Sequence, residues 1–164
     1  MCGILGSIGA VNQERFEQAL DLMEHRGPDA SGTHHRGSFS MGFRRLSIID
    51  LSDEANQPMF TSDGRFGIIF NGEIYNYLEI RDELANLGNE FRTSGDTEVL
   101  LYSFKQWGHK CLEKLNGMFS FAVFDFDEEE VFIARDRLGI KPLYYLMDEG
   151  SFSFASEPKS LIYL

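Results

Sequence analysis

Cys2 is the residue of this chain whose type and position best suit nucleophilic chemistry. Removal of Met1 would make Cys2 the first residue, with a free α-amino group beside its own thiol. An α-amine titrates near ~7.7–8.0 and a free thiol near ~8.5, so at neutral pH part of the amine is unprotonated and can accept the thiol proton. One residue would then supply both the nucleophile and the general base. Because small second residues are common, this prediction depends on the following segment holding the Cys2 backbone in place.

Asn71 and Gly72 offer two hydrogen-bond donors to a negatively charged oxygen. The side-chain amide of Asn71 is one donor, and the backbone N–H of Gly72, a residue without Cβ, can approach a tetrahedral oxyanion closely. The alternative is an ordinary Asn-Gly turn in a hairpin. The residues after Gly72 have a helical pattern and not that of a returning strand, which weakens the hairpin interpretation.

Three charged side chains could bind an amino-acid substrate. Arg45 stands at the end of a predicted strand, where a guanidinium can bind a carboxylate through two parallel hydrogen bonds. Glu73 and Asp96 could hold an α-ammonium group. Simpler interpretations remain open, with Arg45 in a surface ion pair and Asp96 as the N-cap of a helix.

Strands and helices that could position these groups are predicted from hydrophobic periodicity. Residues 2–9 are apolar and glycine-rich, which is typical of a buried strand. A helix is predicted after Asn12 as its N-cap, a second begins with Asn76 and Glu79 as a capping-box pair, and a third runs from near Asp96 to Gly108. Further strands are predicted at 39–50, 66–70, 118–126, 131–134, 143–147 and 152–155.

The order of these elements predicts an α+β fold in one domain. The second half of the chain is rich in strands and tight turns, whereas the long amphipathic helices lie in the first two-thirds. Antiparallel sheets packed on each other and covered outside by helices would bury the apolar faces of both. No repeat or linker divides the chain, so we expect one unit over residues 1–164.

Composition restricts the partners. The net charge of -11 argues against nucleic acid and anionic membranes, because such partners are bound by clusters of lysine and arginine. No apolar stretch has the length of a transmembrane helix or the form of a signal peptide, so we expect a cytoplasmic protein.

The two cysteines, Cys2 and Cys111, do not make a disulfide framework, and with four histidines they show no zinc-ligand spacing. We therefore predict no metal in this domain.

Several motifs in one order resemble the class II glutamine amidotransferase domain, an N-terminal-nucleophile hydrolase, and most closely that of glutamine-hydrolysing asparagine synthetases. The resemblance spans essentially the whole chain. Phe43 departs from the family, in which a histidine commonly precedes the arginine pair. The motifs are Met1-Cys2-Gly3-Ile4, His25-Arg26-Gly27-Pro28-Asp29, Arg45-Leu46-Ser47-Ile48-Ile49-Asp50, Gln57-Pro58-Met59, Asn71-Gly72-Glu73-Ile74-Tyr75-Asn76, Gly95-Asp96-Thr97-Glu98, Gly117-Met118-Phe119 and residues 134–142.

The resemblance implies a fold and a division of roles. The fold would be a four-layer α/β/β/α sandwich. Cys2 would attack the side-chain amide of glutamine, forming a thioester and releasing ammonia, while Asn71 and Gly72 form the oxyanion hole. Arg45, Glu73 and Asp96 would hold the α-carboxylate and α-ammonium groups, and the substrate would also contact the backbone of Leu46, Ser47, Ile48 and Ile49. Residues 135–142 could line the contact with an ammonia-accepting domain, but a glycine-containing turn between strands is the simpler interpretation, so they are left out of the site.

The resemblance also implies a partner that this chain does not contain. In the family, ammonia passes to a synthetase domain that uses ATP and Mg, and no phosphate-binding glycine-rich loop is present here. We expect no cofactor in this domain, and either a piece of a longer chain or a stand-alone subunit. A homodimer is compatible with the sequence. The alternatives are an amidotransferase with another acceptor or substrate amide, and a non-catalytic assembly module that keeps the fold.

Overall fold

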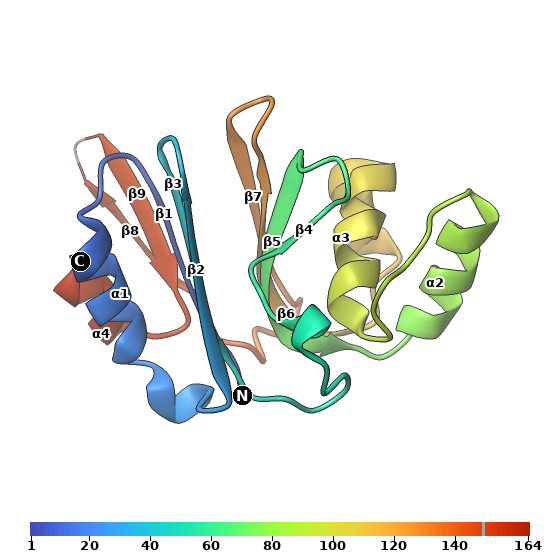
Figure 1. Cartoon of the computed structure of the whole chain (residues 1–164), viewed down its shortest axis with the longest axis horizontal. Coiled ribbons are helices and arrows are strands. Elements are labelled where there is room, and N and C mark those ends of the chain that lie inside the picture. Colours follow the sequence, from blue (N-terminus) through green and yellow to red (C-terminus); the bar gives the residue numbers. More distant parts are fainter. Residues whose placement is uncertain (149) are drawn as a thin grey trace.

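Two antiparallel sheets face each other in the middle of the molecule (Figure 1). The computed structural model describes residues 1–148 and 150–164. The first sheet has the order β2-β3-β1-β9-β8, with strands at Ala30–Arg36, Phe39–Arg45, Gly3–Ile8, Ser151–Ala155 and Tyr144–Asp148. The second has the order β4-β5-β6-β7, with strands at Met59–Phe60, Phe66–Ile74, Gly117–Asp125 and Glu130–Arg135.

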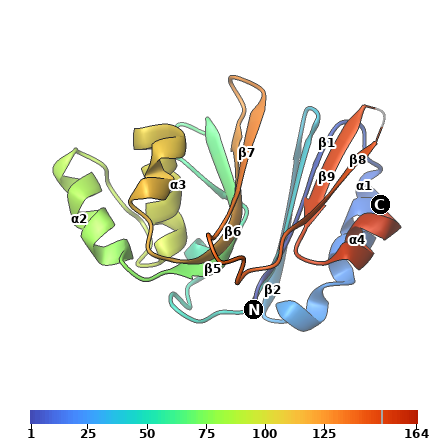
Figure 2. The same ribbon diagram turned by 180° about the vertical axis from the view of Figure 1, so that it is seen from behind.

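Helices cover the outer face of each sheet, which completes four layers (Figures 1 and 2). Helices α1 (Gln13–Asp21) and α4 (Pro158–Tyr163) lie on the first sheet. Helix α3 (Asp96–Trp107) lies on the second sheet, and α2 (Tyr77–Asn86) packs beside α3. Short 3-10 turns occur at Glu24–Arg26, Asp53–Ala55 and Gly108–Glu113. The prediction of an α/β/β/α sandwich is confirmed.

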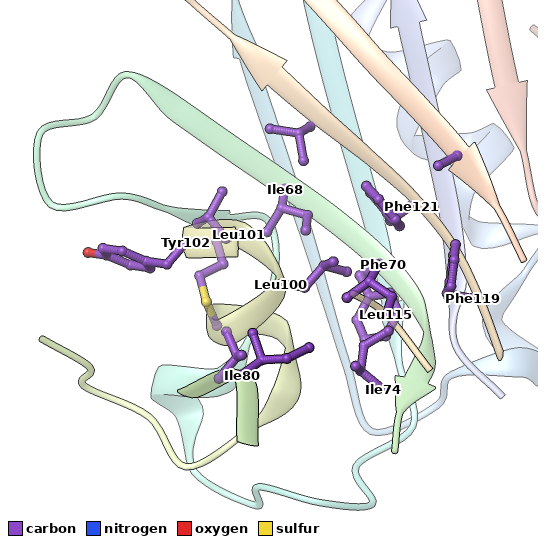
Figure 3. Close-up of a cluster of buried hydrophobic side chains, with 14 of the residues drawn as sticks. Ile68, Phe70, Ile74, Ile80, Leu100, Leu101, Tyr102, Leu115, Phe119 and Phe121 are labelled. Carbon is purple, nitrogen blue, oxygen red and sulfur yellow. The ribbon is translucent and has the colours of Figure 1, made fainter. Parts of the chain in front are cut away.

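Apolar side chains fill the space between each pair of layers. Figure 3 shows the cluster between α3 and the second sheet, where Ile68 and Phe70 of β5 point toward the helix. Alternation along a strand sends neighbouring residues to opposite faces, so Ile69 joins the cluster between the sheets. The same alternation directs Asn71 into the space between the two sheets.

Both connections between the sheets cross at one end of the sandwich, which is also where the N-terminus lies (Figures 1 and 2). One connection follows β3 and leads to β4, and the other follows β7 and leads to β8. The backbone of residue 2 lies directly before β1, the central strand of the first sheet. The first residues are therefore held within a sheet, as the apolar segment 2–9 predicts.

Most predicted elements are present, with four corrections. Strand β5 ends at Ile74 and not at residue 70, because β6 pairs with it as far as Gly117, opposite Ile74. Strand β3 ends at Arg45 and not at residue 50, because the pairing with both neighbours ends there: Gly3 of β1 lies opposite Arg44, and Ala30 of β2 lies opposite Arg45. Asn76 begins α2 but does not cap it through its side chain, which instead bonds Lys114 and Asn116. Strands β2 and β4 lack a clear apolar alternation and were not predicted. Asn12 caps α1 through a bond from the N–H of Arg15, as expected.

Candidate active site

Cys2 is held by contacts on both its backbone and its sulfur. Its carbonyl oxygen accepts a hydrogen bond of 2.9 Å from Nε of Arg26, and Arg26 in turn pairs with Glu157 at 3.2 Å. The sulfur accepts a hydrogen bond from the backbone N–H of Leu46 at 3.4 Å, and lies 3.6 Å from the Leu46 carbonyl oxygen. The side chain of residue 2 is thus placed against the first residue of the β3–β4 connection.

The Cys2 side chain opens onto a cavity of about 100 Å³ between the ends of the two sheets. All the residues predicted for the site line this cavity except Ser47. The backbone N–H of Ser47 instead donates to the carboxylate of Asp29 at 2.8 Å. The structure therefore brings together groups from both sheets and from the β3–β4 connection.

Asn71 presents a buried donor to the cavity. Only 1% of its surface is exposed, and among the described residues its Nδ2 atom has no hydrogen-bond partner. Leaving a buried amide N–H without an acceptor costs about 1–3 kcal/mol, so such a group is unusual unless a ligand completes it. Asn71 lies inside strand β5, so the interpretation as an Asn-Gly turn is wrong.

Gly72 presents a second donor, at the edge of β5. The N–H of Phe70 bonds Oε1 of Gln57 at 2.6 Å, and the N–H of Ile74 bonds Oδ2 of Asp96 at 2.9 Å. Alternate residues of a strand direct their N–H groups to the same side, so that of Gly72 points to this edge as well. A Cβ at residue 72 would lie 2.3 Å from the Met118 carbonyl oxygen.

Arg45 is buried and organises the β3–β4 connection. Its Nη1 donates to the carbonyl oxygen of Ser52 at 2.8 Å and to Oδ1 of Asn56 at 2.7 Å, and its Nη2 donates to the carbonyl oxygen of Asp50. None of the ion pairs among residues 1–148 and 150–164 includes Arg45, so the surface ion-pair interpretation is wrong. A guanidinium has five N–H donors, and those not used on the loop are available at the cavity.

Asp96 and Glu73 place two carboxyl groups on the cavity wall. Burial raises the pKa of Asp96 to about 6, the hydrogen bond from the Ile74 N–H opposes this shift, and the charge of Glu73 adds to it. Asp96 is the first residue of α3, whose N-cap is Gly95, so the interpretation of Asp96 as the N-cap is wrong. Two acidic side chains that repel each other form a favourable place for an ammonium group.

The environment of Cys2 has opposing effects on its thiol. Burial raises the thiol pKa, whereas the hydrogen bond from Leu46 and the positive charges of the N-terminus, Arg45 and Lys141 lower it. The net shift is upward, so the thiol is protonated at neutral pH. A nucleophilic role therefore requires a base close to the sulfur, and the α-amine of Cys2 becomes available only when Met1 is removed.

Several residues that shape the cavity were missed from the sequence. Gln57 caps both polar groups of Phe70, and the buried carboxylate of Glu98 accepts the N–H groups of Arg92 and Thr93 next to the cavity. Lys141 lines the cavity although residues 135–142 were interpreted as a simple turn. The signal that could have found Lys141 is its place within the family motif at residues 134–142.

The chain belongs to the glutamine amidotransferase domain family, whose model matches residues 1–164. It is 43% identical over 169 residues to asparagine synthetase [glutamine-hydrolyzing] 1 of Bacillus subtilis, covering 99% of this chain and 27% of that protein. It is also 43% identical over 182 residues to a putative asparagine synthetase [glutamine-hydrolyzing] of Mycobacterium tuberculosis, with 99% and 28% covered. The chain thus spans about a quarter of the length of these relatives.

The fold has a counterpart among solved structures. Glutamine phosphoribosylpyrophosphate amidotransferase from B. subtilis superimposes with a TM-score of 0.84 over 99% of this chain and 43% of that chain, at 23% identity. This likeness supports the fold, a sandwich of two sheets covered by helices. None of the helices in the described part of the chain is long and apolar enough to cross a membrane.

Proposed function

We propose that this domain hydrolyses glutamine to glutamate and ammonia, with Cys2 as the nucleophile once Met1 has been removed. One observation carries the proposal: the Cys2 sulfur opens onto the cavity that Gly72 and the unpaired Nδ2 of Asn71 also line. A nucleophile that shares a cavity with a side-chain amide donor and a backbone N–H is the arrangement that acyl transfer requires.

The rest of the cavity fits the amino-acid end of glutamine. The α-carboxylate binds the donors of Arg45 that the loop leaves free, and the α-ammonium binds between Asp96 and Glu73. The side-chain amide then extends toward Cys2. Binding an ammonium ion favours the ionised form of Asp96, whose pKa is raised in the free protein.

The reaction proceeds in two halves that share one tetrahedral geometry. The α-amine of Cys2 takes the thiol proton, the sulfur attacks the amide carbon, and Asn71 and Gly72 donate to the oxygen that becomes negative. The C–N bond then breaks, the departing nitrogen takes the proton from the α-ammonium, and ammonia leaves a γ-glutamyl thioester. Water attacks this thioester and restores the thiol, so glutamine and water become glutamate and ammonia.

We further propose that the ammonia serves a synthetase of the asparagine-forming type. The relatives named above carry that description, and this chain matches about a quarter of their length. A synthetase domain or subunit would be the partner, and ATP and Mg would bind there and not in the cavity described here. Cellular location in the cytoplasm is part of the same proposal.

Mass spectrometry after treatment with an electrophilic glutamine analogue tests the proposal. We expect a chain that lacks Met1, with one adduct on Cys2, and glutamate production that stops when the adduct forms. Asparagine is the matched amide control, because it is one methylene shorter and places its amide away from Cys2. A processed protein that leaves glutamine untouched and carries no adduct on Cys2 would contradict the proposal.

A further inference from the structure

Lys141 is a buried cation without a counter-ion among the residues that the structure describes. Only 6% of its surface is exposed, and it lines the cavity onto which Cys2 opens. Its ammonium forms no hydrogen bond or ion pair with residues 1–148 or 150–164. Burial of an unpaired charge is costly, so a lysine in this position is expected to act on something in the cavity.

The backbone around Lys141 is held firmly. The carboxylate of Asp136 accepts the N–H groups of Leu138, Ile140 and Lys141 at 3.2, 2.8 and 2.9 Å. Nε of Arg135 donates to the Lys141 carbonyl oxygen at 2.6 Å. Because its N–H and its carbonyl are both fixed, the β7–β8 connection delivers the Lys141 side chain to the cavity from a defined direction.

Most other charged groups of the cavity already have hydrogen-bond partners or are assigned to the substrate. On the β3–β4 side, Arg45 is bonded to the loop, and Asp50 accepts hydrogen bonds from Ser52 and Ser94. On the side of β5 and α3 lie Glu73 and Asp96, assigned above to the substrate ammonium. Besides Lys141 and Arg45, the N-terminus is the positive group whose charge acts on the Cys2 sulfur.

We propose that Lys141 tunes the nucleophile: its ammonium stabilises the thiolate form of Cys2 and disfavours protonation of the α-amine of the same residue. A positive charge attracts a thiolate and repels an ammonium, so it favours both the attacking form of the sulfur and the unprotonated form of the base. The consequence for glutamine turnover rests on the function proposed above, whereas the effect on the thiol does not.

The pH dependence of Cys2 alkylation by iodoacetamide tests this inference in the processed domain. Mass spectrometry resolves the site, and Cys111 does not interfere because it is fully buried and its pKa is raised to about 12. Lys141→Met and Lys141→Gln remove the charge, and Lys141→Arg keeps it. Lys110→Met is the matched control, since it removes one charge from an exposed lysine outside the cavity.

In both neutral variants we expect the alkylation midpoint to rise by about one pH unit, which is about a tenfold slower reaction at neutral pH. Lys141→Arg and Lys110→Met should keep the wild-type midpoint. The acid limb of kcat/KM for glutamine should shift upward in parallel. Unchanged alkylation midpoints in Lys141→Met and Lys141→Gln would overturn the inference even if the domain hydrolyses glutamine. A shifted midpoint in a domain without glutaminase activity would support it and count against the proposed function alone.

Discussion

Replacing Asp96 with asparagine should make the free domain more stable at neutral pH. The carboxyl group of Asp96 is buried, and its pKa is raised from 3.8 to about 6. A raised pKa of an acid means that the folded state holds the ionised form poorly. Asparagine keeps an oxygen that can accept the Ile74 N–H, now bonded at 2.9 Å, but carries no charge.

The size of this effect follows from the difference between the two pKa values. Below about pH 3.8 the carboxyl group of Asp96 is protonated in both the folded and unfolded states. The wild-type domain and the Asp96→Asn variant should therefore have similar free energies of unfolding there. Between 3.8 and about 6 the unfolded chain releases its proton while the folded chain keeps it, and unfolding becomes easier. Above about 6 the full penalty is present, about 3 kcal/mol, since one pKa unit corresponds to about 1.4 kcal/mol.

Urea unfolding at acidic and neutral pH measures this difference. The gain in the free energy of unfolding for Asp96→Asn should be near zero at about pH 3.5 and approach about 3 kcal/mol at about pH 7.5, with a midpoint of thermal unfolding raised by about 6–12 °C. Glutamine binding should weaken in the same variant, a trade of function for stability. A stability difference that does not change with pH, or a less stable variant at neutral pH, would refute the reasoning.

Three further predictions concern glutamine turnover. Asn71→Ala should lower kcat by about 10²–10³ while the protein stays folded, because it removes one oxyanion donor; unchanged turnover would exclude Asn71 from that role. Arg45→Lys should raise KM for glutamine by about 10–100-fold, since one ammonium cannot bind both the loop and a carboxylate; an unchanged KM would place the α-carboxylate elsewhere. KM should also rise as pH falls through about 6, where Asp96 becomes protonated; the Asp96→Asn protein should lack this dependence.

Much of the fold and of the site was predictable from local patterns. The apolar segment 2–9 predicts the strand that holds Cys2. The strand predicted at 66–70 is present, but its extension through Asn71 and Gly72 to Ile74 is not indicated by the local pattern. The helix ends at Asn12 and Gly108 could also be predicted, because capping depends on residues that are close in sequence. The resemblance to a known family supplied the roles of Arg45, Glu73 and Asp96.

The cavity itself was decided by tertiary structure. Cys2 belongs to one sheet and Asn71 to the other, and only the packing of the two sheets brings them to one space. The buried position of Lys141 and the raised pKa of Asp96 exist for the same reason, since burial and charge depend on groups far apart in the chain. Periodicity and capping depend on neighbours within a few residues of the sequence. Residue types can therefore predict which side chains could act as nucleophile, donor or charged ligand, whereas the packing of the two sheets determines which of these side chains line one cavity.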